Sequence, residues 1–312
     1  MKIIFFGLGS IGRRHANLLK NNFNHEIFAY RSNRKSEKNK FGFQEIYNIK
    51  DIDEINPDIA FITNPTSKHV KTALFCADKG INIFLEKPLS NNKKDLKELK
   101  EIAKKNNVYI YVAYCFRFHP AICWLKKHLE KNNAIHININ NSSYLPNWRE
   151  SNNHLNNYSA SKKMGGGVIL DLSHEIDYIY HLFGDVKNIK SNSKKIGKVT
   201  VDSEDFADIL LELNNKVFCN IHLNFLSRLK KREIIVDFND HTVFADLISN
   251  KILIFNDNTQ EEVEFGNKLD DMYLAQLEYF FKKIKKGEMM NQLSEAMEVF
   301  DIIIDVKKAA RK

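Results

Sequence analysis

The sequence predicts an α/β protein of two domains, of which the first is a doubly wound parallel sheet. With 312 residues, the chain is longer than one hydrophobic core usually organises. Over the first third, short apolar runs alternate with stretches of helical period, which is typical of parallel strands connected by helices. Farther along, apolar and polar residues alternate within several segments, which indicates strands with one covered face. We place the domain boundary between residues 118 and 119.

The composition is that of an ordinary globular protein, and we expect it to bind neither nucleic acid nor membranes. Hydrophobic residues make up 43% of the chain and charged residues 28%, which excludes a disordered or fibrous protein. The net charge is +8, but the lysines are scattered among acidic residues and asparagines, as on solvated helix faces. The excess charge is therefore only weak evidence for anionic ligands. No apolar run has transmembrane length, and no signal-peptide cleavage site follows the apolar start.

Cysteine usage is consistent with a cytoplasmic protein. The four cysteines show no C-x-x-C spacing, which disfavours zinc and a disulfide framework. We find no metal-ligand cluster, and His222 and His241 are better interpreted as residues of a sheet face than as ligands. The sequence therefore predicts no metal.

A glycine-rich turn between the first strand and the first helix is the strongest signal in the N-terminal domain. Residues 3–6 form an apolar run, G-L-G-S-I-G follows directly, and we expect a helix over residues 13–20. In this setting G-x-G-x-x-G is the dinucleotide-binding fingerprint. The first glycine makes the tight turn, the second lets the backbone approach a pyrophosphate, and the third permits close packing of helix on strand. A methyltransferase also has a glycine-rich first turn, so the motif alone leaves the ligand open. The predicted cofactor contacts in this turn are Gly7, Gly9, Ser10, Ile11 and Gly12.

The residues after the second strand favour NADP(H) over NAD(H). That strand, residues 26–30, ends roughly 20 residues after the glycine turn, where an NAD site usually has an acid for the ribose hydroxyls. Here Arg31, Ser32 and Arg34 follow instead, and a basic, hydroxyl-bearing loop end would pair with a 2′-phosphate. The alternative is a merely basic surface loop.

Two further strands deliver polar residues to the carboxyl edge of the same sheet, where open parallel sheets bind ligands. Residues 58–63 lead into Asn64-Pro65 and a helix that contains His69, and residues 81–85 lead into Glu86-Lys87-Pro88. Lys87 is placed to donate to a substrate oxygen, from a turn that proline stiffens. A helix over residues 92–105 and a strand over residues 108–113 complete the alternating pattern.

The stretch from Gly165 to Asp177 is where we place the chemistry. Three glycines precede a segment of helical period, so we expect a helix to begin here. On that helix Asp171 and His174 share a polar arc with Tyr178 and His181, opposite an apolar stripe. An Asp one turn from a His can orient the imidazole and stabilise its protonated form, as a general acid/base requires. The alternative is a solvated helix face that carries two incidental histidines.

A loop before the glycines offers candidate substrate contacts. Trp148 and Arg149 belong to the run Y-L-P-N-W-R, a composition that often binds a sugar or an acid group, and Tyr158 follows closely. The alternative for an exposed loop arginine is solvation alone.

Strands dominate the rest of the second half. On the strand over residues 217–225, Phe218 and His222 share one face and Cys219 and Ile221 the other, so one side of the sheet packs on helices and the other meets solvent or another subunit. The remaining strands are expected at 134–144, 207–213, 233–238, 242–247 and 252–255, and two closing helices at 270–286 and 294–308.

The motifs occur in one order along both halves of the chain and together resemble the Gfo/Idh/MocA family of NAD(P)-dependent sugar and cyclitol oxidoreductases. The resemblance implies a Rossmann domain over residues 1–118. It also implies an α/β domain over residues 119–312, built on a large, mainly antiparallel sheet, for substrate binding and oligomerisation. The motifs are Gly7-x-Gly9-x-x-Gly12-x-x-His15, Asn64-Pro65-x-x-x-His69, Glu86-Lys87-Pro88, Arg117-Phe118-x-Pro120 and the stretch from Gly165 to Asp177.

The resemblance also assigns site residues. Lys87, Asp171 and His174 correspond to the catalytic residues that flank the reacting carbinol in the family. Many members have three residues between the Asp and the His, whereas this chain has two, which leaves open whether Asp171 or His174 is the main proton carrier. Further expected cofactor contacts are Arg31, Ser32, Arg34, Asn64, Pro65, His69, Glu86 and Lys87, and expected substrate contacts are Arg117, Trp148, Arg149, Tyr158, Asp171 and His174.

These residues predict hydride transfer between a nicotinamide cofactor and a sugar-derived carbinol or ketone, with NADP(H) preferred and NAD(H) as the alternative. In the oxidation direction we expect His174 to take the hydroxyl proton and Lys87 to hydrogen-bond the same oxygen, while Asp171 orients the site. The Y-L-P-x-W-R loop and D-L-S-H-E-I-D resemble a branch associated with bacterial surface-polysaccharide and nonulosonic-acid sugars. The alternatives are a non-catalytic dinucleotide-binding regulator on the same scaffold and a methyltransferase, which has no use for the lysine turn. We expect a homodimer or homotetramer formed through the open sheet face.

Overall fold

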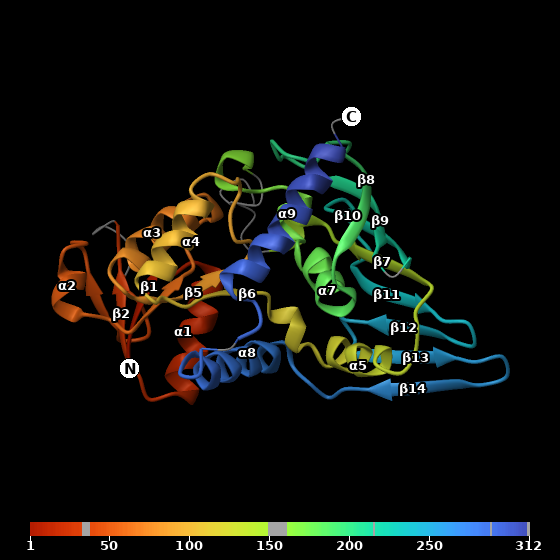
Figure 1. Ribbon diagram of the computed structural model, residues 1–312, viewed down its shortest axis with the longest axis horizontal. Helices are drawn as coiled ribbons and strands as arrows, with labels where there is room; N and C mark the ends of the chain where they lie inside the picture. The colour runs from red at the N-terminus through yellow and green to blue at the C-terminus, as the bar shows by residue number, and fades with distance from the viewer. Residues whose placement is uncertain (33–37, 149–160, 215, 288, 311–312) are drawn as a thin grey trace. The chain divides into compact units, whose positions relative to one another are not determined.

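The computed structural model describes residues 1–32, 38–148, 161–214, 216–287 and 289–310. The chain divides into two compact units (Figure 1). One consists of Met1–Tyr114 and Tyr273–Glu298, and the other of Cys115–Met272 and Val299–Lys312. The first break lies close to the predicted boundary at 118/119. The return of residues 273–298 to the first unit differs from that prediction, which assigned the whole C-terminal half to the second domain.

Within its described residues, the first unit holds a six-stranded sheet in the order β3-β2-β1-β4-β5-β6. Every neighbouring pair is parallel, as expected for a doubly wound domain whose ligand edge lies at the strand carboxyl ends. β4 is buried along its whole length, because helices cover both faces of such a sheet. The strands are β1 (Lys2–Phe6), β2 (Glu26–Tyr30), β3 (Gln44–Ile46), β4 (Ile59–Ile62), β5 (Asn82–Glu86) and β6 (Ile110–Ala113).

Helices cover both faces of this sheet, with α1 and α8 on one and α3 and α4 on the other (Figure 1). Leu277 and Phe280 of α8 are fully buried and pack with Phe61 and Phe84 of the sheet. This apolar contact explains why the segment after residue 272 belongs to the first unit. The helices are α1 (Ser10–Asn22), α2 (Asp51–Ile55), α3 (His69–Asp78), α4 (Leu96–Lys105) and α8 (Leu269–Ile284), with a 3-10 turn η1 (Thr66–Lys68).

The described part of the second unit holds an eight-stranded sheet in the order β14-β13-β12-β11-β7-β10-β9-β8. The β7–β10 pair is parallel and the other pairs are antiparallel. The predicted fold class, a parallel Rossmann sheet followed by a mainly antiparallel sheet, is therefore confirmed. The strands are β7 (His136–Ser142), β8 (Val186–Lys194), β9 (Phe206–Leu213), β10 (Phe218–Asn224), β11 (Lys231–Asp237), β12 (Thr242–Asp246), β13 (Lys251–Phe255) and β14 (Gln260–Glu264).

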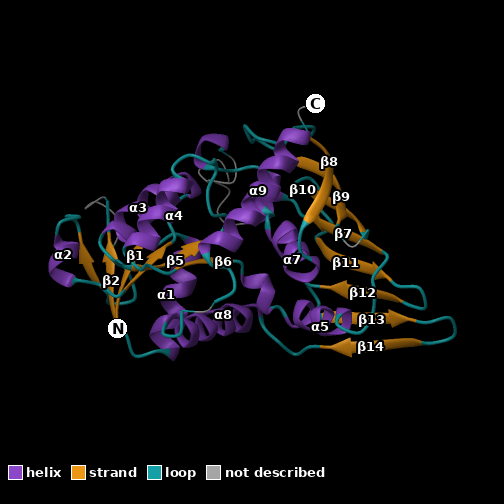
Figure 2. Ribbon diagram, viewed as in Figure 1, coloured by secondary structure: helices purple, strands orange, loops and turns teal. Residues whose placement is uncertain are grey.

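Among the described residues, helices cover one face of the second sheet and leave the other open. Figure 2 shows α5, α7 and α9 on the same side of the sheet. Along β10, Cys219 and Ile221 are buried, while Phe218 and Asn220 are exposed, so the predicted alternation is present. The helices of this region are α5 (Pro120–Leu129), α6 (Val168–Asp171), α7 (His174–Phe183) and α9 (Leu293–Ala309), with 3-10 turns η2 (Cys115–Phe118), η3 (Leu145–Trp148) and η6 (Lys162–Met164).

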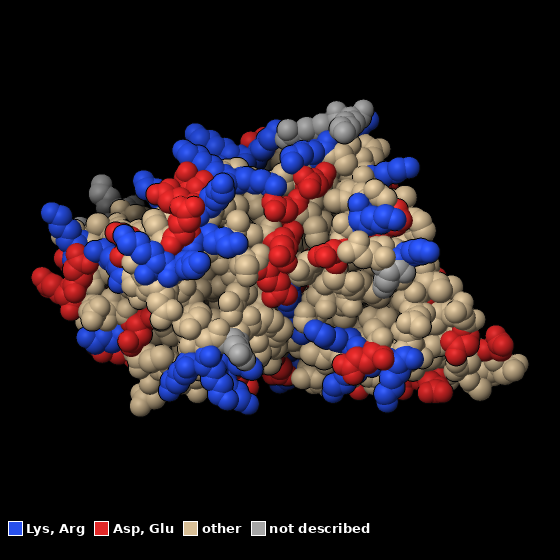
Figure 3. All heavy atoms as spheres, in the orientation of Figure 1, with Lys and Arg blue, Asp and Glu red and all other residues tan. Residues whose placement is uncertain are grey.

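Charged residues are mixed over the molecular face drawn in Figure 3, where Lys and Arg lie among Asp and Glu. This arrangement agrees with the scattered lysines of the sequence. Among the described residues, no helix is both long and apolar enough to cross a membrane.

Candidate active site

The glycine turn between β1 and α1 forms a close-packed cradle. Gly7 has φ +109°, and a Cβ there would lie 2.8 Å from the Asn64 nitrogen and the Thr63 carbonyl oxygen of the neighbouring loop. A Cβ at Gly12 would collide with the Gly7 carbonyl oxygen, to which the Thr63 hydroxyl donates a hydrogen bond. Only glycine satisfies both positions, so the backbone of this turn is fixed against the loop after β4.

Gly9 serves a different purpose in the same turn. It is the exposed N-cap of α1, and among the described residues nothing lies within 4 Å of a Cβ built on it. Because glycine has no side chain, the first backbone N–H groups of α1 receive no cap from this residue, and their partial positive charge is available to an anion. A pyrophosphate fits this requirement. The residues present therefore fit a dinucleotide, with Gly9, Ser10 and Ile11 at the helix start.

His69 joins the loop after β4 to the turn after β5. Its Nδ1 lies 2.9 Å from the Pro88 carbonyl oxygen and its Nε2 lies 2.9 Å from the Asn64 carbonyl oxygen. Burial lowers the pKa of His69, so the neutral ring donates to one of these carbonyls. With both nitrogens facing protein backbone, His69 positions the loop of Asn64 and Pro65, and direct cofactor contact by its ring stays a prediction.

A buried pair connects α1 to the turn that carries Lys87. His15 Nε2 lies 2.7 Å from Glu86 Oε1, and Glu86 Oε2 accepts a hydrogen bond from the Lys87 backbone N–H at 3.2 Å. The rings of Phe84 and Tyr273 meet the His15 ring edge-on. The sequence offered His15 only as part of a motif, and the structure gives it a partner 71 positions away.

Arg31, predicted to contact a 2′-phosphate, has an acidic partner that the sequence did not reveal. Its Nη1 donates to Glu45 Oε1 at 2.7 Å. Glu45 comes from β3, a three-residue strand too short to show a pattern. Ser32 follows Arg31, and Arg34 lies outside the described residues.

In the second unit, the expected continuous helix is broken, which corrects the sequence interpretation. Asp171 is the last residue of α6, His174 is the first residue of α7, and a turn of two residues separates the two helices. The two side chains therefore do not sit on one uninterrupted polar arc. Tyr178, assigned to the same arc, is fully buried, so that face meets the protein interior rather than solvent. Gly167, the residue directly before α6, has φ +119°.

His174 lies beside the R-F-x-P turn. The centroid of its ring lies 4.9 Å from that of the Phe116 ring in η2. The Arg232 guanidinium stacks on the same Phe116 ring, 3.6 Å from its centroid. Arg232 also pairs with Glu175 at 2.7 Å, whose Oε1 accepts a bond from Asn141 as well. The sequence missed Glu175 and Arg232, which are 57 positions apart.

Arg117 is not an open substrate contact in this structure. Its guanidinium donates to both carboxylate oxygens of Asp177, with Nε at 3.0 Å and Nη2 at 2.7 Å, and both side chains are fully buried. The pair holds η2 to α7 and so positions Phe116 beside His174. A substrate role for Arg117 stays a prediction that these contacts do not support.

Trp148 is anchored in the protein but partly exposed, and its contact with a substrate stays a prediction. Its Nε1 donates to Ser143 Oγ at 2.9 Å and its ring meets Phe225 edge-on, yet the residue is 38% exposed. Arg149 and Tyr158 lie outside the described residues. Lys87 belongs to the first unit, and Asp171 and His174 to the second.

Two family models match this chain. The oxidoreductase family with an NAD-binding Rossmann fold matches residues 1–114, which contain the whole parallel sheet. The GFO/IDH/MocA C-terminal domain matches residues 133–243, which contain most of the second sheet, and together the two matches cover more than two thirds of the chain. The chain belongs to the Gfo/Idh/MocA family. It is an NAD(P)-dependent oxidoreductase, as predicted.

Individual relatives agree with this membership. The chain is 26% identical to the myo-inositol 2-dehydrogenase of Thermotoga maritima in an alignment that covers 92% of this chain and 89% of that protein. It is 32% identical to oxidoreductase P35 of Formosa agariphila over 153 residues, which are 45% of each protein. Its fold is similar to that of UDP-N-acetylglucosamine 3-dehydrogenase from Acidithiobacillus ferrooxidans, with a TM-score of 0.82, 19% identity and coverage of 99% of this chain and 97% of that one.

Proposed function

We propose that this protein transfers a hydride reversibly between a nicotinamide dinucleotide and a carbinol or ketone of a sugar, cyclitol or nucleotide sugar. The observation that carries the proposal is the glycine cradle at the start of α1, tied through His15 and Glu86 to the turn of Lys87. The glycine cradle fits a pyrophosphate, and the turn after β5 carries Lys87. The named activities of the inositol and UDP-sugar dehydrogenases above support this class of substrate.

In this proposal, side chains of the protein accept the hydroxyl proton and stabilise the negative charge that develops on the substrate oxygen. The nicotinamide, when bound, supplies the hydride acceptor or donor. In the oxidation direction His174 accepts the hydroxyl proton, and Lys87 donates a hydrogen bond to the same oxygen as negative charge develops on it. Asp171 orients the site. Because α6 ends at Asp171 and α7 begins at His174, the two side chains are positioned by different helices. Asp171 is therefore the alternative to His174 as the main proton carrier.

For the cofactor, we propose NADP(H) in preference to NAD(H). Arg31 directly follows β2, where the adenosine ribose of a bound dinucleotide is expected. A guanidinium at that place favours a 2′-phosphate over a pair of hydroxyls.

For the biological context, we propose biosynthesis of bacterial surface-glycan sugars in the cytoplasm. The motifs Y-L-P-x-W-R and D-L-S-H-E-I-D support this branch. Trp148 adds an exposed aromatic of the kind on which sugars stack. The free state of Cys76, Cys115, Cys123 and Cys219 is compatible with a reducing compartment.

For the assembly, we propose a homodimer or homotetramer formed through the open face of the second sheet. Leu210, Phe218 and Phe255 are exposed and belong to β9, β10 and β13. On β10 and β9, His222 pairs with Asp208. Such a mixed face on a long sheet is typical of a contact between identical subunits.

Ligand fluorescence tests the functional class. We expect NADPH and NADH to bind and S-adenosylmethionine to leave the protein unchanged. Binding of S-adenosylmethionine without binding of either dinucleotide would contradict the proposal. A regulator on the same scaffold would bind dinucleotide without turning over any sugar or cyclitol in a substrate panel.

A further inference from the structure

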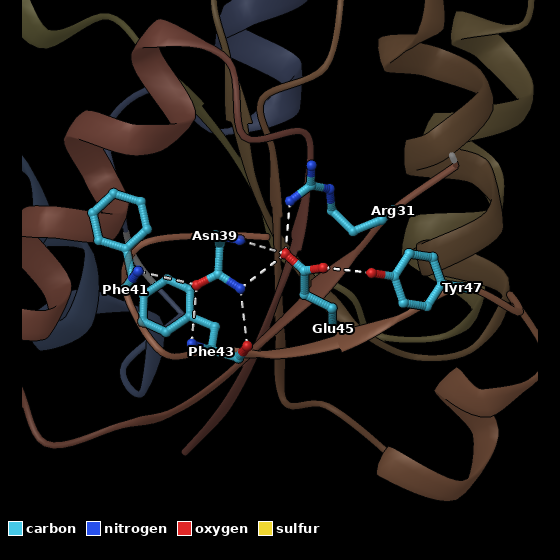
Figure 4. A network of polar contacts seen from close by, with 6 residues as sticks. All are labelled: Arg31, Asn39, Phe41, Phe43, Glu45 and Tyr47. Atoms are coloured by element: carbon cyan, nitrogen blue, oxygen red, sulfur yellow. Dashed lines mark hydrogen bonds and ion pairs between the residues drawn. The ribbon is translucent and has the colours of Figure 1, made fainter. Parts of the chain in front are cut away.

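The residue that follows β2 is held by a carboxylate from the neighbouring strand. β3 pairs with β2 in parallel, with Glu45 opposite Ala29, and the Arg31 backbone N–H donates to the Ile46 carbonyl at 2.9 Å. The Arg31 side chain then reaches back to Glu45, as Figure 4 shows. An acid is therefore present at the adenosine end of the predicted cofactor site, although it comes from β3 rather than from β2.

Glu45 is fixed by donors on both of its oxygens. Oε1 accepts bonds from Arg31 Nη1 at 2.7 Å, from the Asn39 backbone N–H at 2.7 Å and from Asn39 Nδ2 at 3.0 Å. Oε2 accepts the Tyr47 hydroxyl at 2.6 Å. Burial alone would raise the pKa of Glu45, but the hydrogen bonds from Tyr47 and Asn39 and the charge of Arg31 outweigh it and lower that pKa to about 2. Glu45 is therefore an anion at every physiological pH.

The donors themselves are anchored. Asn39 Oδ1 accepts the backbone N–H groups of Phe41 and Phe43, at 3.1 and 3.0 Å, and Asn39 Nδ2 also donates to the Phe43 carbonyl. The Phe43 ring stacks on those of Phe41 and Phe5, so the turn rests on the core of the first unit. Figure 4 shows Glu45 held within this network by Arg31, Asn39 and Tyr47.

The charge at this end of the site is that of a pair and not of a lone arginine. The side chains of Arg31 and Glu45 are only 16% and 9% exposed, so solvent screens their mutual attraction less than it screens a surface pair. A 2′-phosphate near Arg31 would meet the repulsion of a carboxylate together with the attraction of a guanidinium. The two hydroxyls of an unphosphorylated ribose carry no charge, so a carboxylate does not repel them and can accept their hydrogen bonds.

We propose that Glu45 determines cofactor selectivity: by offsetting the charge of Arg31, it weakens the preference for NADP(H) and lets the enzyme use NAD(H) as well. The inference rests on the proposed function, because it needs a dinucleotide bound with its adenosine ribose at the end of β2. It goes beyond the prediction from Arg31 alone by adding a second residue that acts in the opposite direction.

Dissociation constants for NADPH and NADH, measured on the full chain by nicotinamide fluorescence, test this assignment. Glu45→Gln keeps an oxygen acceptor and removes the charge. We expect the ratio of NADPH to NADH affinity to rise about tenfold, the size expected for one charge at a partly shielded site. Raising the ionic strength should shrink this increase, a response that a loss of packing would not produce.

Two further variants keep the test decisive. Tyr47→Phe removes a neutral donor to the same carboxylate and should leave the affinity ratio unchanged. Arg31→Gln leaves the carboxylate unopposed and should bring the ratio below one. Loss of the guanidinium alone would not reverse the preference, so this variant provides a second reading if Glu45→Gln does not fold. A ratio for Glu45→Gln within about twofold of wild type, or the same rise in Tyr47→Phe, would overturn the role of Glu45 while leaving the proposed function intact. Failure of the wild type to bind either dinucleotide would instead overturn the proposed function and the inference together.

Discussion

At the scale of single residues, buried ion pairs hold the candidate site together. Arg117 and Asp177 are both fully buried, and the pair joins the turn of Phe116 to α7, the helix that begins with His174. A buried charge that loses its partner cannot be solvated, so such pairs are far more sensitive to substitution than exposed ones. The pairing of Arg117 with Asp177 could not be found from local sequence, because 60 positions separate the two residues.

Asp177→Asn should lower the free energy of unfolding by about 3 to 5 kcal/mol, because the Arg117 guanidinium would be left buried without its counter-charge. Urea denaturation measures the loss. The matched control is Glu212→Gln in the pair with Lys187, which should leave the urea midpoint nearly unchanged because solvent screens that pair. Equal effects of the two substitutions would contradict this account of the Arg117 pair.

Arg31 gives the prediction that concerns cofactor choice. We expect the wild type to bind NADP(H) more tightly than NAD(H), by a margin that Glu45 limits, and Arg31→Asp to invert the order because two carboxylates would then face the 2′-phosphate. Titration with both reduced cofactors provides the comparison. Equal or tighter NADH binding by the wild type, together with no change in Arg31→Asp, would refute the assignment.

At the scale of elements, strong local patterns were predictable and polar or very short elements were not. β2 matches its predicted bounds at residues 26–30, and α9 (Leu293–Ala309) lies within one residue of its prediction at each end, because apolar period and flanking breakers agree there. β8 and β14 were missed because they are edge strands with mostly polar residues. α5 was not predicted; Pro120 occupies the first turn of this helix, which His119 caps.

Some residues of the candidate site were likewise predictable from local sequence, and others were not. The glycine turn and the Glu86-Lys87-Pro88 turn are contiguous motifs, so the sequence revealed them. The break between α6 and α7 was not foreseen, because the apolar period of this stretch continues through the turn. Glu45, Glu175 and Arg232 act through partners distant in sequence, and a single chain without its fold gives no signal for them.

The start of α6 provides a test at this scale. A Cβ at Gly167, which has φ +119°, would lie 2.6 Å from Glu204 Oε1, and Glu204 is itself held by Lys307 at 3.0 Å. Gly167→Ala should therefore destabilise the protein by about 1 to 3 kcal/mol through backbone strain and steric conflict. Gly266→Ala is the control, because no described atom lies within 4 Å of its Cβ. Similar unfolding midpoints for both variants would contradict the argument.

At the scale of the whole molecule, the open sheet face predicts self-association. Light scattering at micromolar concentration should give a mass at least twice that of the 36.4 kDa chain. Phe218→Asp, in the proposed interface, should shift the mass toward the monomer, since a charge would be buried there. Leu229→Asp, at an exposed apolar residue between β10 and β11, should not. A monomeric wild type would exclude the proposed assembly.

We propose that Lys87 and His174 act on the same substrate oxygen during hydride transfer. Steady-state kinetics of Lys87→Ala and His174→Ala test it most directly, with a panel that begins with myo-inositol and UDP-N-acetylglucosamine and with NADPH titration of each variant. A positioned acid/base or a charged donor to a developing oxyanion is commonly worth ~10² or more in rate. We therefore predict that each variant loses turnover by at least about a hundredfold while cofactor affinity stays within a few-fold of wild type. Near-normal turnover in both variants would place the reaction elsewhere and contradict the account.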